Sequence, residues 1–199
     1  MKKMPSLFVR VFEDHRIKTI TSKVTEGCHW VFEEPVRATI KFDGTATYFY
    51  GGELWKRYDA KRGKPVPDGA IRCQPEADPV TGHLPCWVKV SKDNPGDKWF
   101  VKAYEYALEN GFVFEEDKTY ELCGPHFQGN PENLEYDSFI LHGSVECDDL
   151  DVSNLSFDSI KEWLYNHYVE GIVFYRATGE MCKIKRSDFG LAWKEKVRG

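Results

Sequence analysis

The stretch EGIVFYRATGEMCKIKR, residues 170–186, has the composition of two β-strands joined by a short turn. Its first part, EGIVFYR, and its last part, MCKIKR, are rich in residues that favour strands. The four residues ATGE at 177–180 separate them and contain the glycine that a tight turn often needs. The stretch therefore predicts an antiparallel hairpin.

A four-residue turn fixes which residues of this hairpin face one another. It would pair Phe174 with Lys183 and Ile172 with Lys185. Because side chains alternate between the two faces of a strand, Lys183 and Lys185 would share one face, which Glu170 would begin. We expect two lysines and a carboxylate to converge there. An exposed face with a cross-strand ion pair is the alternative interpretation.

A second hairpin is predicted near residue 50. The run ATYFY at 46–50 is followed by Gly51-Gly52 and then by ELWKRYD, and a two-residue glycine link is a strong hairpin signal. This turn would place Ala46 opposite Arg57. Upstream of it, Lys41 interrupts an apolar run two residues before Asp43. Such a lysine is either a solvated edge residue or a nucleophile held in a pocket.

The rest of the chain mixes strands with two helices. Helical spacing over 99–111 ends at Gly111, and a second helix should begin at Ser156 or Asp158. A long loop with five prolines spans 61–86. Further strands are expected at 5–12, 28–32, 87–90 and 119–124. Many antiparallel strands with few helices predict an α+β fold.

Bulk properties indicate one globular domain over residues 1–199. The chain is 41% hydrophobic and 30% charged, and its net charge is -5, so overall charge alone would not hold nucleic acid. Residues 183–199 nevertheless carry six bases and two acids, which is either a basic face or an ordinary solvated surface.

Cellular context also follows from composition. Six cysteines without a CxxC pair suggest reduced thiols rather than a disulfide framework. The sequence has neither a membrane-length apolar run nor a leader-like start, so we expect a cytoplasmic monomer that does not bind membranes.

Four short motifs occur one after another between residues 41 and 186. KFDG at 41–44, YELCG at 120–124, EGIVF at 170–174 and KIKR at 183–186 resemble motifs I, III, IV and V of the covalent nucleotidyltransferases, which include ATP-dependent DNA and RNA ligases and mRNA capping enzymes. ATIKFDGT, QPEADPVTGH, YELCGPHFQGNPENL and ILHGS further resemble the small RNA-ligase family that includes the vertebrate RNA ligase. This similarity runs from about Trp30 to Trp193.

The resemblance implies a fold with two departures from the wider superfamily. It implies an ATP-grasp-like nucleotidyltransferase domain of antiparallel sheets flanked by helices. Many relatives carry an arginine where this chain has Ala46; Arg57 on the facing strand could supply the missing guanidinium, and Lys56 is the adjacent candidate. The chain ends soon after Lys185, so no C-terminal OB-fold is expected.

The chemistry that the resemblance implies has three steps. Lys41 attacks the α-phosphorus of ATP and forms lysyl-AMP; AMP moves to an RNA 5′-phosphate; an RNA 3′-hydroxyl then displaces AMP. The first step needs a neutral amine, although an ordinary lysine is protonated at pH 7. Lys183, Lys185 and Arg57 are the expected cations that depress the lysine pKa and contact the phosphates.

Other roles are implied for the remaining motif residues. Glu121 would accept a ribose hydroxyl, and the backbone of Thr39 and Ile40 would lie near adenine, against Val173 or Phe174. Glu170, together with Asp43, would bind Mg²⁺ or Mn²⁺. Three alternatives stay open: AMP transfer to a protein or small molecule, a DNA ligase-like enzyme, and a nucleotide-binding protein without turnover.

Overall fold

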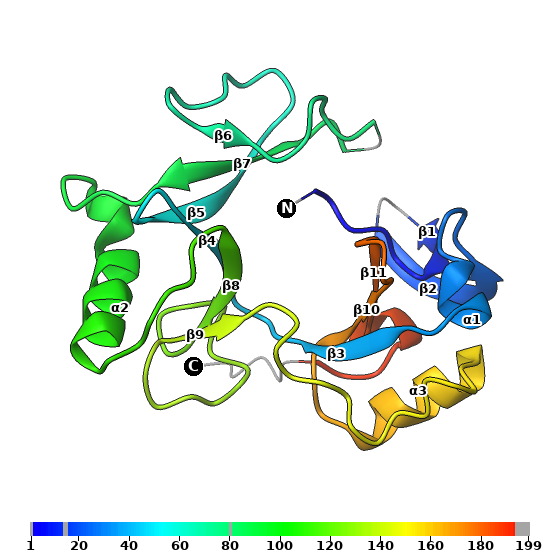
Figure 1. Cartoon of the computed structure of the whole chain (residues 1–199). Helices are drawn as coiled ribbons and strands as arrows, with labels where there is room; N and C mark the ends of the chain where they lie inside the picture. Colours follow the sequence, from blue (N-terminus) through cyan, green and yellow to red (C-terminus); the bar gives the residue numbers. More distant parts are fainter. Residues whose placement is uncertain (1, 14–15, 80, 194–199) are drawn as a thin grey trace. The chain divides into compact units, whose positions relative to one another are not determined.

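The computed structural model describes residues 2–13, 16–79 and 81–193 of the 199-residue chain. The chain forms two compact units, one with a six-stranded sheet and the other with two smaller sheets (Figure 1). Unit 1 comprises Met1–Lys3 and Asp43–His142, and unit 2 comprises Met4–Phe42 and Gly143–Gly199. Mostly antiparallel sheets with few helices agree with the α+β prediction. The ATP-grasp-like architecture without an OB-fold and the single-domain assignment stay predictions.

Unit 1 is built on a six-stranded antiparallel sheet. Its strand order is β6-β7-β5-β4-β8-β9. The strands are β4 (Thr45–Tyr50), β5 (Glu53–Ala60), β6 (Ile71–Arg72), β7 (Leu84–Lys89), β8 (Lys118–Cys123) and β9 (Ser138–Leu141).

The β4–β5 hairpin has the predicted two-residue turn. Gly51 and Gly52 have φ angles of 64° and 72°, a left-handed conformation that glycine adopts without steric cost. Tyr50 pairs with Glu53, and Thr47 pairs with Lys56. The predicted register of this hairpin is therefore confirmed.

Helix α2 (Lys98–Glu109) covers one face of the six-stranded sheet, after the short 3₁₀ helix η1 (Pro95–Asp97). It presents Ala103 and Ala107, four residues apart, to the buried core of unit 1. The other buried members of this core are Leu54, Phe114, Tyr120, Leu122, Phe127 and Phe139. Trp99, in the first turn of α2, is 37% exposed.

Unit 2 contains two smaller antiparallel sheets. A three-stranded sheet has the order β11-β10-β3, and β1 pairs with β2. Backbone bonds from Leu7 and Lys183 join residues 5–7 to β11, and Ile40 and Cys147 bond across to join 145–147 to β3. The strands are β1 (Phe8–Glu13), β2 (Arg16–Val24), β3 (Arg37–Lys41), β10 (Gly171–Tyr175) and β11 (Met181–Lys185).

Three helical segments complete unit 2: α1 (Trp30–Glu33), α3 (Phe157–Asn166) and the 3₁₀ helix η2 (Arg186–Phe189). The predicted strand over 28–32 is wrong, because a five-residue apolar run cannot distinguish a strand from a short helix. Helix α3 is capped by Ser156, whose hydroxyl accepts from the backbone N–H of Ser159 at 3.0 Å.

The predicted register of the last hairpin is wrong by one residue. Val173 pairs with Lys183, and Gly171 pairs with Lys185. The loop is one residue shorter than expected, because Arg176 N donates to Glu180 O at 2.9 Å and only residues 177–179 lie between them. A one-residue shift moves every side chain to the other face, so Ile172 and Phe174 point into the core and are fully buried.

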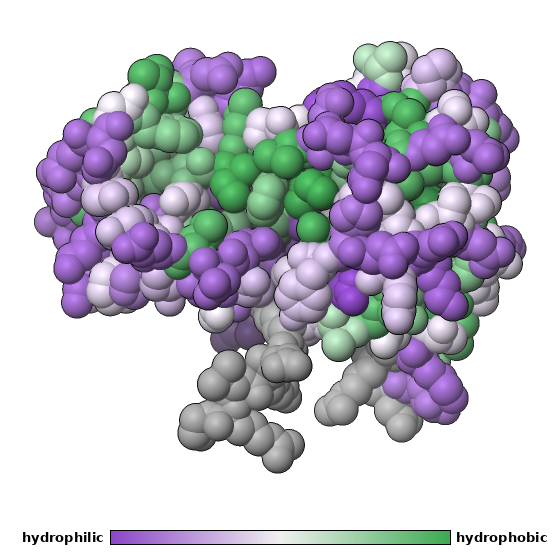
Figure 2. All heavy atoms as spheres, turned by 90° about the horizontal axis from the view of Figure 1, so that it is seen from below, coloured by the Kyte–Doolittle hydropathy of each residue, from purple (hydrophilic) through white to green (hydrophobic). Residues whose placement is uncertain are grey.

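Other expectations have simpler outcomes. The six cysteines are free thiols, as predicted. Among the described residues, no helix is long and apolar enough to cross a membrane. Hydrophilic residues cover much of the face in Figure 2, interrupted by smaller hydrophobic patches. The basic residues Lys194, Lys196 and Arg198 lie outside the described residues.

Candidate active site

Three strands of unit 2 bring the predicted lysines onto one face of a sheet. Lys41 on β3 pairs with Gly171 on β10, and Gly171 pairs with Lys185 on β11. Lys183 lies two residues before Lys185 and therefore on the same face. The predicted convergence of the lysines is found, although the register that produces it differs.

Gly171 separates the two outer lysines without a side chain. A Cβ atom added there would lie 2.1 Å from the carbonyl oxygen of Ile184 and 3.0 Å from the Cα of Lys185. The first of these distances is shorter than real Cβ contacts, and the atoms in the way belong to the backbone. Glycine is therefore required for the close approach of β10 and β11 at the lysine row.

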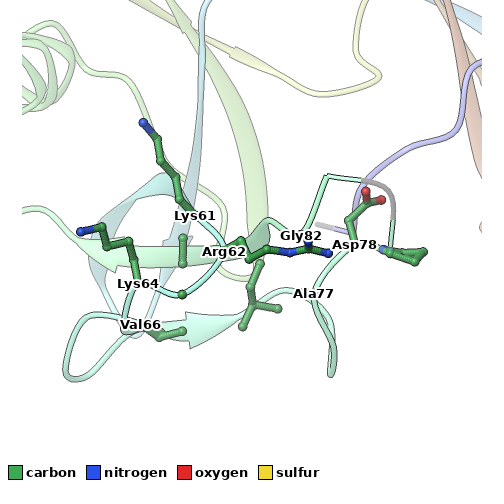
Figure 3. Close-up of a pocket in the computed structure, with 11 residues that line it drawn as sticks. Lys61, Arg62, Lys64, Val66, Ala77, Asp78 and Gly82 are labelled. Carbon is green, nitrogen blue, oxygen red and sulfur yellow. The ribbon is translucent and has the colours of Figure 1, made fainter. Parts of the chain in front are cut away.

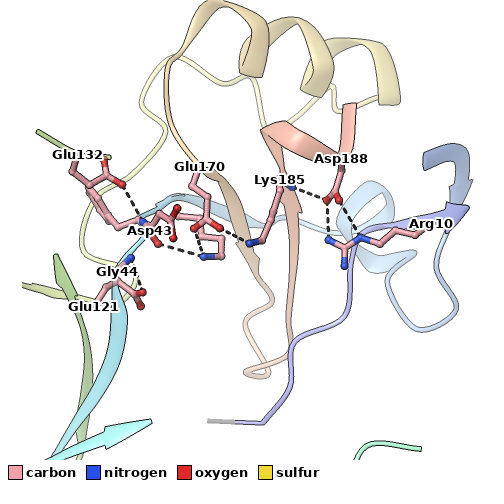
Figure 4. A network of polar contacts seen from close by, with 10 residues as sticks. Arg10, Asp43, Gly44, Glu121, Glu132, Glu170, Lys185 and Asp188 are labelled. Carbon is pink, nitrogen blue, oxygen red and sulfur yellow. Dashed lines mark hydrogen bonds and ion pairs between the residues drawn. The ribbon is translucent and has the colours of Figure 1, made fainter. Parts of the chain in front are cut away.

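Glu170 binds two of the three lysines. Its Oε2 accepts from Lys41 Nζ and its Oε1 accepts from Lys185 Nζ. Glu170 is only 3% exposed, whereas the Lys41 and Lys185 side chains are 20% and 32% exposed. Figure 4 shows Glu170 reaching toward Lys185. A buried carboxylate thus fixes two partly accessible ammonium groups.

Lys183 has a different electrostatic environment. Burial lowers its pKa from 10.5 to about 8, with the positive charges of Lys41 and Lys185 acting in the same direction. Arg10 also lowers the pKa, and Glu170 opposes these effects. Lys183 is therefore much easier to deprotonate near neutral pH than an ordinary lysine.

Two residues that the motifs did not include hold the backbone of Lys185. Asp188 is 2% exposed, and its carboxylate accepts two hydrogen bonds from Arg10, at 3.0 and 2.9 Å. The same carboxylate accepts from Lys185 N at 3.0 Å (Figure 4). Asp188 lies three residues after Lys185, the spacing of a helix cap, which is the sequence signal for it. Arg10 has no comparable signal.

The residues expected near adenine lie along the same strands. Thr39 pairs with Val173, two residues along from the pair of Lys41 and Gly171. Val173 is on the lysine face, whereas Phe174 faces the core, so only Val173 could line a site on this face. The backbone N–H of Ile40 already donates to Val145 O at 2.9 Å.

Unit 1 holds the other predicted residues. Glu121 on β8 accepts from the backbone N–H of Gly44 at 3.0 Å, and its second oxygen lies 2.8 Å from His142 Nε2. The other ring nitrogen of His142 lies 2.9 Å from Thr119 Oγ1. His142 is therefore a partner of Glu121 that the four motifs do not include.

Asp43 and Arg57 are also placed in unit 1. The backbone N–H of Asp43 donates to Glu132 Oε1 at 3.0 Å. Arg57 Nε donates to Asp59 at 2.8 Å, and its guanidinium lies 5.7 Å from the ring centre of Trp87. Ala46 pairs with Glu121 on β8.

The chemistry of the unit 2 cluster suits an anionic substrate. Three amines on one sheet face can neutralise phosphate oxygens, and an amine is also a nucleophile once deprotonated. Within the described part of the chain, no group of three or more His, Cys, Asp or Glu side chains is arranged to hold a metal ion.

Comparisons with known proteins find similarity to RNA ligase 1. The RNA ligase 1 family model matches residues 113–198, which include Glu121, Glu170, Lys183 and Lys185.

Individual relatives match at low identity. RNA ligase 1 of Pongo abelii is 25% identical and RNA ligase 1 of Rattus norvegicus 27%, each match covering 71% of this chain and 49% of the relative. RNA ligase 1 of Danio rerio is also 27% identical, over the same shares. The chain spans about half the length of the curated relatives it matches. The chain is therefore similar to RNA ligase 1 over residues 113–198 by the family model and, at 25–27% identity, over 71% of its length by the individual relatives.

Proposed function

We propose that this chain is an ATP-dependent RNA ligase that carries AMP on Lys41. The observation that carries the proposal is the shared carboxylate of Glu170, which gathers Lys41 and Lys185 from two distant motifs. The similarity to RNA ligase 1 supports RNA as the substrate. Its ends would be a 5′-phosphate and a 3′-hydroxyl.

In the first step, the Nζ of Lys41 forms a P–N bond to the α-phosphorus of ATP. The P–O bond to pyrophosphate breaks, and pyrophosphate leaves with its electron pair. The amine must lose its proton to attack, and Glu170, which accepts a hydrogen bond from Lys41, can take that proton. Lys183 and Lys185 stabilise the negative charge that develops on the phosphates.

A divalent cation, Mg²⁺ or Mn²⁺, would partly neutralise the triphosphate when bound. Glu170 fits as a ligand because hard cations prefer carboxylate oxygens and Mg²⁺ often binds through one or two carboxylates plus substrate phosphates. Both of its oxygens now hold lysines, so binding a cation would require Glu170 to release one of them. Asp43 is the second carboxylate proposed for this role.

The later steps use the 5′-adenylylated RNA. An oxygen of the RNA 5′-phosphate attacks the phosphorus of lysyl-AMP, the P–N bond breaks, and the Lys41 amine is protonated again. The RNA 3′-hydroxyl then attacks the 5′-phosphorus, the P–O bond to AMP breaks, AMP leaves, and the hydroxyl proton passes to solvent. We assign Glu121 to a ribose hydroxyl, Arg57 to a phosphate, and Thr39, Ile40 and Val173 to the adenine.

The test is adduct formation followed by strand joining. Purified protein incubated with ATP and Mg²⁺ should gain the mass of one AMP group, as seen by intact mass spectrometry. Lys41→Ala should gain none, while Lys161→Ala, an exposed position on α3, should behave like the wild type. Glu170→Ala and Lys185→Ala should form little adduct.

The adduct should then convert 5′-phosphorylated RNA into a joined product. An AMP adduct on Lys41→Ala would refute the assigned nucleophile. An adduct that passes AMP to a protein, to a small molecule or only to DNA would refute RNA ligation. ATP binding without pyrophosphate release would leave a nucleotide-binding protein.

A further inference from the structure

The six-stranded sheet of unit 1 has a second face with an unusual composition. Phe49 and Leu54 point toward the core beneath α2, so their neighbours Tyr48 and Trp55 point to the opposite face. The outward face of an antiparallel sheet is normally polar. Here it carries two tyrosines and two tryptophans: Tyr48, Tyr50, Trp55 and Trp87.

Three of these rings form a continuous stack across the strands. The ring centres of Tyr50 and Tyr48 are 5.5 Å apart with an interplanar angle of 6°, and those of Tyr48 and Trp87 are 5.4 Å apart. Arg57 lies over Trp87 and closes that end, where Trp87 is only 3% exposed. Tyr50 is 46% exposed, so the stack is open at its other end.

A cationic loop follows directly on β5. The residues Lys61, Arg62 and Lys64 are exposed, and the segment 60–67 contains no acidic residue. Lys64 N donates to Lys61 O at 2.9 Å, which fixes a tight turn. The loop borders a pocket of about 340 Å³. Figure 3 shows Lys61 and Lys64 extending from the loop, while Arg62 reaches over Gly82.

The ring stack and the loop lie along one strand. Tyr50 pairs with Glu53 at the start of β5, and Lys61 follows its end. Eight residues at about 3.3 Å each separate these two points by about 26 Å. A path of that length suits a strand of several nucleotides, in line with sites of about 4–16 nucleotides on other single-strand binders.

We propose that this face of unit 1, from Tyr50 to Lys64, binds single-stranded RNA. A base stacks on the open face of Tyr50, and Lys61, Arg62 and Lys64 contact backbone phosphates. Stacking suits any base, because every base has a flat π-face, and the cations supply attraction that does not depend on sequence. The proposal rests on the proposed function, since it gives the RNA strand of that reaction its binding surface.

The test measures RNA binding without ligation chemistry. The probe is a 12-nucleotide single-stranded RNA with a 5′-hydroxyl and a 3′-fluorescein, titrated with the full chain by fluorescence anisotropy in the absence of ATP. Tyr50→Ala should weaken binding by about tenfold, and Tyr50→Phe should restore it. Tyr165→Ala, an exposed tyrosine on α3, is the matched control and should bind normally.

The cationic loop has its own readout. Lys61→Gln combined with Lys64→Gln should make the plot of log K against log salt shallower by about 1.4, because each phosphate that a lysine no longer neutralises reduces the slope by about 0.7. Lys161→Gln should leave the slope unchanged. No measurable binding by the wild type, or equal binding and equal slopes in all variants, would overturn the proposal.

The outcome is separable from that of the proposed function. If the protein forms an AMP adduct and the Tyr50 and loop variants bind RNA as the wild type does, the proposed RNA-binding surface is refuted and the ligase mechanism is not. If those variants bind RNA more weakly but the protein never forms an AMP adduct, the RNA-binding surface is supported and the ligase mechanism is refuted.

Discussion

Lys41 donates a hydrogen bond to the carboxylate of Glu170, a residue 129 positions later in the chain. Antiparallel pairing of β3 with β10 brings the two together, since Gly171, next to Glu170, is the partner of Lys41. Because Glu170 also holds Lys185, a single buried acid offsets two ammonium charges. Substitutions that remove this carboxylate or disturb the strands around it should therefore lower the free energy of unfolding.

Glu170→Gln should destabilise unit 2. Glutamine cannot neutralise Lys41 and Lys185, so two partly buried ammonium groups would lose their counterion. We expect a loss of about 2 kcal/mol, below the roughly 3–5 kcal/mol typical of fully buried pairs because both lysines are partly exposed. Urea unfolding followed by circular dichroism measures it. Glu180→Gln, which removes an exposed partner of Arg176, should change stability by less than about 0.5 kcal/mol. Equal losses in the two variants would contradict the assignment.

Lys183 should make stability depend on alkaline pH. Its folded-state pKa of about 8 lies below the ordinary 10.5, so between these values the unfolded chain holds a proton that the folded chain has released. Stability then rises with pH across this window. Lys183→Met removes the titration.

The wild type should therefore gain about 2 kcal/mol relative to Lys183→Met between pH 8 and 10.5, a value reduced from the full shift because the side chain is only partly buried. Denaturant midpoints of both proteins at several pH values measure the difference. A difference that stays constant with pH would show that Lys183 titrates normally.

Arg10 and Asp188 should be energetically coupled. Arg10→Met would leave the buried carboxylate of Asp188 without its cation and cost about 3 kcal/mol. Asp188→Asn in the same chain removes the charge but keeps an oxygen that can accept from Lys185 N. The double variant should therefore be more stable than the sum of the single changes predicts, by at least about 1 kcal/mol. Strict additivity in a double-mutant cycle would mean that the pair contributes little.

Gly171→Ala should disturb both stability and the lysine row. The added Cβ would meet the backbone of Ile184 and Lys185, which cannot move aside like a side chain, and we expect a cost of about 2 kcal/mol. Gly96→Ala is the control, because its Cβ would lie 3.2 Å from the side-chain oxygen of Asn94. Thermal melting compares them. If Gly171→Ala melts with the wild type, the strands are not as close as described.

Several local features of this protein could be predicted from its sequence. Gly51-Gly52 predicted one hairpin, the cap of α3 was predicted at Ser156 or Asp158, and the motifs predicted that Lys41, Lys183 and Lys185 would converge. These features depend on neighbours in the chain or on short patterns, which a single sequence displays directly.

Features that depend on packing emerged only in the folded chain. The last hairpin is shifted by one residue, because burying Ile172, Phe174 and Ile184 on one face fixes the register more strongly than the length of the turn. Arg10 pairs with Asp188, although they lie 178 residues apart with no pattern to link them. Burial and charge pairing act between residues brought together by the whole fold, and for that reason only the folded structure shows them.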